Sequence, residues 1–180
     1  MARLPYNDFR SHHTPPKYPT LNVLKLLSHS SATINHWADV GNAQFKHLSL
    51  SPRDRELVIL LSTAKFRSTY EWTHHIPIST KAGVTDEERQ VIQDAGAQAR
   101  YFSGQKPTTK FNTKDGILLD SVETIIEHPE VGEELWARVK ELFSDREIVE
   151  IISLQGFYYM FSRLTTVLEV DMDSFAKSKL

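Results

Sequence analysis

The chain has 180 residues, of which 40% are hydrophobic and 24% are charged, and its length fits one globular domain with a single core. A formal net charge of -2 and a pI near 6.4 give no positive field for phosphate backbones or anionic lipid, so we expect neither nucleic acid nor a membrane as a partner. No apolar run approaches the roughly 18 residues of a membrane span. The chain contains no Cys, which excludes disulfides, thiolate metal sites and thiol redox chemistry.

The two ends of the chain carry different signals. Residues 1–20 hold four prolines among polar residues and predict an extended N-terminal arm. Residues 174–180 form a tail that closes with Ser178, Lys179 and Leu180. This tripeptide is a peroxisomal address that an import receptor reads at the extreme C-terminus. We therefore expect that receptor as a partner and a peroxisomal location, with an accidental polar tail and a cytoplasmic location as the alternative.

Helix start and stop signals recur along residues 21–173, and no stretch alternates apolar and polar residues as a strand would. The predicted fold class is all-α. The expected helices, in chain order, cover residues 21–27, 32–47, 51 to a break near 67, 68–82, 85–97, 117–127, 130–143 and 145–168.

Four of the expected helices begin with a recognisable cap. Ser51-Pro52-Arg53-Asp54 offers a hydroxyl cap and a first-turn proline, whereas Ser68 to Glu71 and Thr85 to Glu88 have the capping-box pattern. Residues 54–62 also line up with residues 145–153, each a capped start to an apolar helix. A duplication and a shared helix-start chemistry both explain this likeness. Either one suggests a central pair of buried helices with a pocket between them.

The densest group of chemically active side chains lies at residues 70–75, Tyr-Glu-Trp-Thr-His-His. Glu71 and His75 are four residues apart and share one helix face. A carboxylate beside an imidazole fixes its tautomer and lets the ring accept and return a proton near neutrality. Glu56, on the preceding apolar helix, is costly to bury without a partner, and His75 is the obvious one. We predict His75, Glu56 and Glu71 as catalytic residues.

Each residue of this group also has a purely structural interpretation. Glu71 is equally explained as the reciprocal residue of a capping box, and Glu56 as an acid that favours the helix N-terminal dipole. His74 faces differently from His75 and fits a packing role, and Trp72 fits the core or a pocket wall.

No metal site is predicted. Glu71, His74 and His75 are conceivable ligands, but adjacent histidines on one helix seldom point at the same ion, and no His-Glu-x-x-His pattern occurs. The other adjacent pair, His12-His13, lies in the arm and is expected to be exposed to solvent.

Residues 50–60, 70–78 and 81–88 resemble the carboxymuconolactone decarboxylase superfamily, whose redox-active branch is the AhpD-type alkylhydroperoxidases. The resemblance covers about residues 21–173 as one domain. It implies an AhpD-like helical domain that assembles as a trimer or hexamer and acts on a small-molecule substrate.

The resemblance also assigns positions in the site. In the redox branch a Cys-x-x-Cys-x-x-x-His motif opens the second helix and a proton-relay Glu lies on the helix before. Here the two Cys positions hold Ser68 and Glu71, the His position holds His75, and the relay position holds Glu56. Because hydroxyl and carboxylate groups cannot cycle through a disulfide, thiol peroxidase activity is excluded.

The resemblance therefore implies the decarboxylase-like branch and a cofactor-independent acid/base enzyme. The first expectation is a lyase, a decarboxylase of a small cyclic carboxylated or lactone compound, in which the site holds an oxyanion and delivers a proton. An isomerase or cyclase of a polyketide-like or aromatic-derived metabolite is the first alternative, and a non-catalytic oligomeric ligand-binding protein is the second. The residues predicted to contact substrate are Tyr70, Trp72, His74, Arg67 and Ser68.

Overall fold

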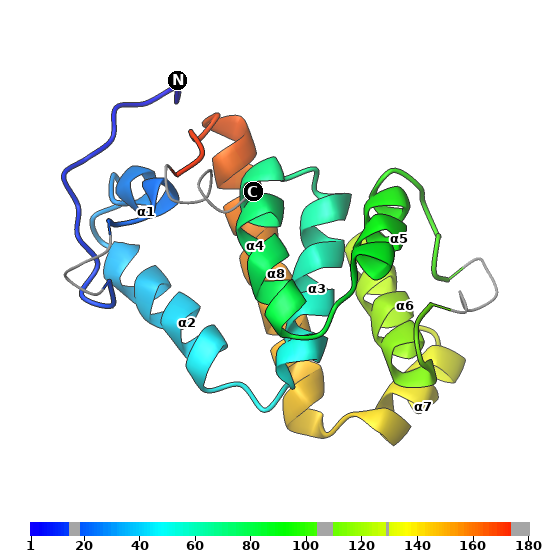
Figure 1. Cartoon of the computed structure of the whole chain (residues 1–180). Coiled ribbons are helices and arrows are strands. Elements are labelled where there is room, and N and C mark those ends of the chain that lie inside the picture. The colour runs from blue at the N-terminus through cyan, green and yellow to red at the C-terminus, as the bar shows by residue number, and fades with distance from the viewer. Residues whose placement is uncertain (15–18, 104–109, 129, 174–180) are drawn as a thin grey trace.

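The structure is a computed structural model that describes residues 1–14, 19–103, 110–128 and 130–173, and every regular element in these ranges is an α-helix (Figure 1). The all-α prediction is confirmed. The helices are α1 (Asn22–Leu27), α2 (Ile34–Lys46), α3 (Pro52–Lys65), α4 (Thr69–Lys81), α5 (Asp86–Gly96), α6 (Thr113–Glu127), α7 (Glu133–Leu142) and α8 (Asp145–Val167). The predicted peroxisomal signal at 178–180 lies outside the described residues and stays a prediction.

Four of the eight helices in the described ranges begin with a side-chain cap bond, and three of these starts were predicted. The Ser51 hydroxyl accepts a hydrogen bond from the amide of Asp54 at 3.0 Å, and Thr85 forms a reciprocal capping box with Glu88. Helix α6 begins four residues earlier than predicted, because the Asn112 side chain caps it by accepting from the amide of Asp115. That cap was hidden among the Thr and Lys residues of a segment that resembles a loop.

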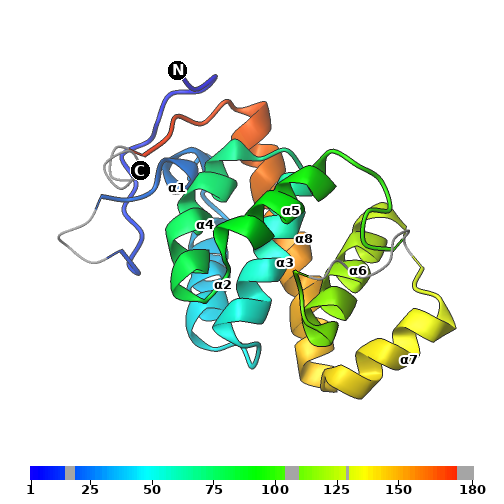
Figure 2. The same ribbon diagram turned by 45° about the vertical axis from the view of Figure 1, so that its right-hand side comes forward.

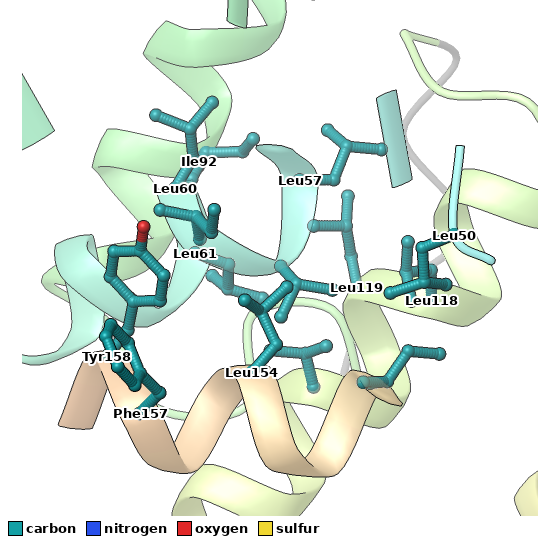
Figure 3. Close-up of a cluster of buried hydrophobic side chains, with 14 of the residues drawn as sticks. Leu50, Leu57, Leu60, Leu61, Ile92, Leu118, Leu119, Leu154, Phe157 and Tyr158 are labelled. Carbon is teal, nitrogen blue, oxygen red and sulfur yellow. The ribbon is translucent and has the colours of Figure 1, made fainter. Parts of the chain in front are cut away.

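Helix α3 forms the centre of the fold. Residues 57–61 on this helix are completely buried, and α4, α5, α6 and α8 all pack against it (Figures 2 and 3). A helix that is apolar on all sides must be enclosed in this way, since any open face would expose apolar surface to water.

Helix α8 packs against α3 and completes the central pair. Its buried face follows helical spacing through Ile151, Leu154, Tyr158, Phe161 and Thr165. The opposite face exposes large apolar side chains, among them Val149, Ile152 and Tyr159. The oligomer implied by the resemblance stays a prediction.

The N-terminal arm is tied to the end of the chain that follows α8. The amide of Arg3 donates to the carbonyl of Leu168 at 2.9 Å, and the Tyr6 hydroxyl bonds to Asp171 at 3.0 Å (Figure 1). Within the described ranges, none of the helices combines the length and the apolar character needed to cross a membrane.

Helix α5 ends at Gly96, which lies directly against the backbone of α3. A Cβ added there would come within 2.8 Å of the carbonyl carbon and oxygen of Ala64. We expect Gly96→Ala to lower the free energy of unfolding by about 1–3 kcal/mol, because backbone cannot move aside as a flexible side chain would. Chemical denaturation measures this difference.

The matched control is Gly116→Ala in α6, where nothing lies within 4 Å, and it should stabilise by about 0.5–1 kcal/mol. Equal stabilities for the Gly96 variant and the parent would contradict the close packing.

Candidate active site

A cavity of about 490 Å³ lies among α1, α2, α4 and α8, and arm residues Ser11, His13 and Thr14 form one side of it. Its wall is mainly apolar, with an aromatic part made of Trp37, Phe45, Phe157 and Phe161. Helix α3 contributes no lining residue, and its residues 56–63 are all buried. The prediction of a pocket between the two central helices, α3 and α8, is therefore wrong. The cavity is lined by α4 and α8 on the side that faces α1 and α2.

His75 lines this cavity from α4 and is held from behind by Glu56. Its Nδ1 donates to Glu56 Oε2 at 2.7 Å, and Glu56 itself is completely buried. The other carboxylate oxygen, Oε1, accepts from Arg55 Nε at 3.1 Å. The pairing of Glu56 with His75 expected from the sequence is confirmed, and Arg55 adds the cation that makes a buried carboxylate tolerable.

The second imidazole nitrogen meets a residue that the sequence analysis missed. Tyr158 on α8 lines the cavity, and its hydroxyl lies 2.9 Å from His75 Nε2. Burial raises the pKa of Tyr158 well above its usual value, and the charges of Glu56 and Glu71 act in the same direction. The phenol is therefore protonated and donates to Nε2, which holds His75 as the Nδ1–H tautomer.

Tyr158 left a signal in the sequence. Tyr158 and Thr165, seven residues apart, are polar residues that share the buried, mainly apolar face of α8 with Ser162. Buried polar groups need partners, so both positions indicated contacts to a polar site. Their partners are His75 and Glu71.

Phe45 fixes the plane of the His75 ring. The two rings stack with centroids 5.9 Å apart and an interplanar angle of 24°. The Arg55 guanidinium lies 4.8 Å from the centre of the Phe45 ring and also donates to the Phe45 carbonyl. Contacts to Glu56, Tyr158 and Phe45 thus orient the imidazole before any ligand enters.

Glu71 lines the same cavity and is almost fully buried. One oxygen, Oε2, accepts from the Ser68 hydroxyl and from the Thr165 hydroxyl at 2.8 Å, whereas Oε1 is buried with no hydrogen-bond partner among the described residues. Burial raises the pKa of Glu71, and the bonds from Ser68 and Thr165 only partly oppose this. Glu71 therefore retains its proton at a higher pH than an ordinary glutamate does.

The capping box predicted at Ser68 is wrong. Ser68 occupies the N-cap position of α4, but its hydroxyl makes no capping bond to the helix backbone. Instead the hydroxyl bonds to the Glu71 carboxylate and lies 3.2 Å from the Thr165 hydroxyl. Ser68 does not line the cavity, so it positions Glu71 and does not contact a substrate there.

Tyr70 and His74 both line the cavity, and both direct a polar atom to Asp173. The Tyr70 hydroxyl donates to Asp173 Oδ2, and His74 Nε2 lies 3.1 Å from the same oxygen. Asp173 Oδ1 accepts from the amide of Asn22 at the start of α1. Burial lowers the pKa of His74, but the bonds to Asp173 and to the Tyr70 carbonyl outweigh it, so the pKa is raised. This group ties α1 and α4 to the segment after α8.

Trp72 and Arg67 do not line this cavity, so their roles as substrate contacts stay predictions. Trp72 is partly buried against the core. Arg67 has a positive φ of 58° just after α3 and its side chain is exposed. This left-handed backbone conformation forms the turn between α3 and α4, where the sequence predicts a break. The turn directs the side chain to solvent.

The arm departs from expectation in one respect. His13 lines the cavity and its side chain is 29% exposed, whereas His12 is exposed as predicted.

Comparison with known proteins agrees with this architecture. Residues 32–105 match the model of the Carboxymuconolactone decarboxylase family, and this range includes Glu56, Glu71 and His75. The comparison with curated proteins finds no match. Among solved structures, an uncharacterized peroxidase-related protein from Silicibacter sp. TM1040 is similar with a TM-score of 0.69 over 86% of this chain and 77% of that one. The sequence identity is 15%, so this likeness concerns the fold alone. Residues 32–105 are thus similar to the Carboxymuconolactone decarboxylase family, and the chain has an AhpD-like helical fold.

Proposed function

We propose that this protein is an acid/base enzyme that moves a proton at the carbon next to the carbonyl of a small, largely apolar cyclic ketone or lactone. The observation that carries the proposal is the array Glu56–His75–Tyr158, whose hydroxyl end lies in the wall of the cavity that Glu71 also lines. One side of the cavity thus offers a proton acceptor, and another offers a proton donor.

The array supports a balanced proton transfer. As the Tyr158 oxygen takes a proton from the substrate carbon, its own proton passes to His75 Nε2. The resulting imidazolium is stabilised by Glu56, which already accepts the Nδ1 proton. The electron pair left on the substrate becomes an enolate, and protonated Glu71 donates a hydrogen bond to its oxygen. Return of the proton to a different carbon completes an isomerisation, and its return to the same carbon gives exchange with solvent.

The lining of the cavity favours a neutral substrate. Among the described residues that line it, none is Lys or Arg, so no permanent cation offers a bidentate clamp for a free carboxylate. The aromatic part formed by Trp37, Phe45, Phe157 and Phe161 suits a flat ring. Decarboxylation is the second candidate, favoured by the family match. It uses the same groups: the array takes the proton of the substrate's carboxylic acid, the carbon–carbon bond breaks to release CO₂, and the same proton returns through Tyr158 to the carbon.

Solvent exchange in D₂O tests the proposal without a known substrate. The protein is incubated with a panel of small cyclic ketones, lactones and their carboxylated analogues, and the products are followed by mass spectrometry and NMR. We expect deuterium to enter the carbon next to the carbonyl of at least one neutral compound, at least tenfold faster than without protein. Loss of CO₂ from a carboxylated analogue would instead establish the second candidate.

The control separates catalysis from binding. Tyr158→Phe keeps the ring but loses the hydroxyl, so it should retain ligand binding and lose exchange by about 10²-fold or more. Binding of panel compounds in the cavity with no exchange above background would contradict the proposal and leave a ligand-binding protein.

A further inference from the structure

A tight turn in the arm brings two adjacent histidines to the same side of the chain. The amide of Thr14 donates to the carbonyl of Ser11 at 3.0 Å, and the amide of His13 lies 3.3 Å from the Ser11 hydroxyl. His12 and His13 are the two central residues of this turn. In an extended segment their side chains would point in opposite directions. Here the ring centroids lie 4.1 Å apart.

Both imidazoles converge on one oxygen of α2. Asp39 Oδ1 lies 2.9 Å from His12 Nε2 and 2.7 Å from His13 Nε2. Within the described ranges, these three side chains form a group that could hold a metal ion. Each offers one nitrogen or oxygen ligand atom, and these atoms all lie within 4.8 Å of one another. Two imidazole nitrogens and one carboxylate are a set that first-row transition metals accept, whereas Mg²⁺ and Ca²⁺ prefer oxygen ligands alone.

His12, His13 and Asp39 lie at the edge of the cavity, where the arm meets α2. The arm reaches the cavity wall through Ser11, which is buried, and through His13 and Thr14. Asp39 follows directly on Ala38, another lining residue, on α2. A bond between the arm and Asp39 therefore closes one edge of the cavity.

We propose that His12, His13 and Asp39 bind one divalent transition-metal ion of the zinc type, which fastens the arm to α2 at the edge of the cavity. The ion is held by Nε2 of each histidine and a carboxylate oxygen of Asp39, and water completes its coordination on the exposed side. Its role is to hold the arm, and the proton transfers described above do not pass through it. The inference rests on the arm and α2 and is independent of the proposed reaction.

Direct metal titration of the full chain, with any affinity tag removed, tests this site. Zn²⁺ is followed by calorimetry and Co²⁺ by its visible absorption, each as the metal alone. We expect one ion per chain. His12→Ala, His13→Ala and Asp39→Asn should each weaken binding by more than about tenfold. The matched control is His36→Ala, an exposed histidine on the same helix, which should bind as the parent does.

A second measurement reports on the arm itself. Trypsin cleavage after Arg10 should slow at least several-fold when Zn²⁺ is added to the parent protein, and it should not change when Zn²⁺ is added to the Asp39→Asn variant. The proposal is overturned if neither ion binds at millimolar concentration, if His36→Ala weakens binding as much as the three ligand variants do, or if Zn²⁺ leaves the cleavage rate of the parent unchanged.

Discussion

Replacing His75 by Gln should lower the turnover of any compound that the parent protein converts by about 10²- to 10⁴-fold, with little change in ligand binding. A glutamine amide can still donate to Glu56 Oε2, which accepts from His75 Nδ1 at 2.7 Å in the parent. The amide cannot take up the Tyr158 proton. The substitution therefore keeps the buried carboxylate satisfied and removes only the base.

Two other variants serve as comparisons for the His75→Gln result. His75→Ala removes the partner of Glu56 and should cost stability as well as activity, because a buried carboxylate then loses a hydrogen bond. His128→Ala alters an exposed histidine at the end of α6 and should change neither quantity. Turnover of His75→Gln within a few-fold of the parent would contradict the assigned role.

Glu71→Gln should lower turnover by about 10²-fold or more and make the protein more stable at alkaline pH. Glutamine can keep its carbonyl oxygen on the Ser68 and Thr165 hydroxyls, where Glu71 Oε2 now lies. Its amide N–H is a much weaker acid than a carboxyl O–H, so the hydrogen bond it donates stabilises an enolate oxygen less. The loss of activity thus reflects the acid function, since shape and hydrogen bonds to the helix are retained.

The stability effect follows from the direction of the Glu71 pKa. Burial raises this pKa in the folded protein above the ordinary value of 4.5, so the folded state holds a proton that the unfolded state releases. The stabilisation from that proton is complete below about pH 4.5 and is lost as the pH rises through the folded pKa. Glutamine does not ionise, so the advantage of the variant should grow with pH and reach about 1–3 kcal/mol.

Urea denaturation of both proteins between pH 4 and pH 9 measures this difference. The turnover of the parent should also fall as the pH rises through the same pKa, whereas the residual turnover of Glu71→Gln should lack that limb. A constant stability difference across the range would show that Glu71 is not a buried acid that retains its proton.

Local chemistry made the helices predictable from the sequence. Caps such as Ser51 and Thr85 act within one turn, so their bonds depend on few other residues. Ser68 is the exception, because Thr165, nearly a hundred residues later, joins it in bonding the Glu71 carboxylate. A capping pattern therefore identified the helix start correctly and the bond wrongly.

The site was predictable only in part. The sequence predicts the contact between Glu56 and His75, because a buried carboxylate needs a partner and the next helix carries one. Tyr158 and Asp173 lie about 80 and 100 residues from their partners, and only the packing of α8 and the segment after it brings them near. Trp72 does not reach the cavity wall because neighbours in sequence on a helix need not share a face, and Arg67 does not reach it because it lies in the turn between α3 and α4.

A crystal structure with the most readily exchanged compound bound tests the central idea most directly. We predict that the compound occupies the cavity with its reacting carbon about 3–3.5 Å from the Tyr158 oxygen and its carbonyl oxygen within hydrogen-bond distance of the Glu71 carboxyl group. The account would be contradicted by a compound that binds elsewhere on the protein, or by one that lies in the cavity with its carbonyl directed away from both groups.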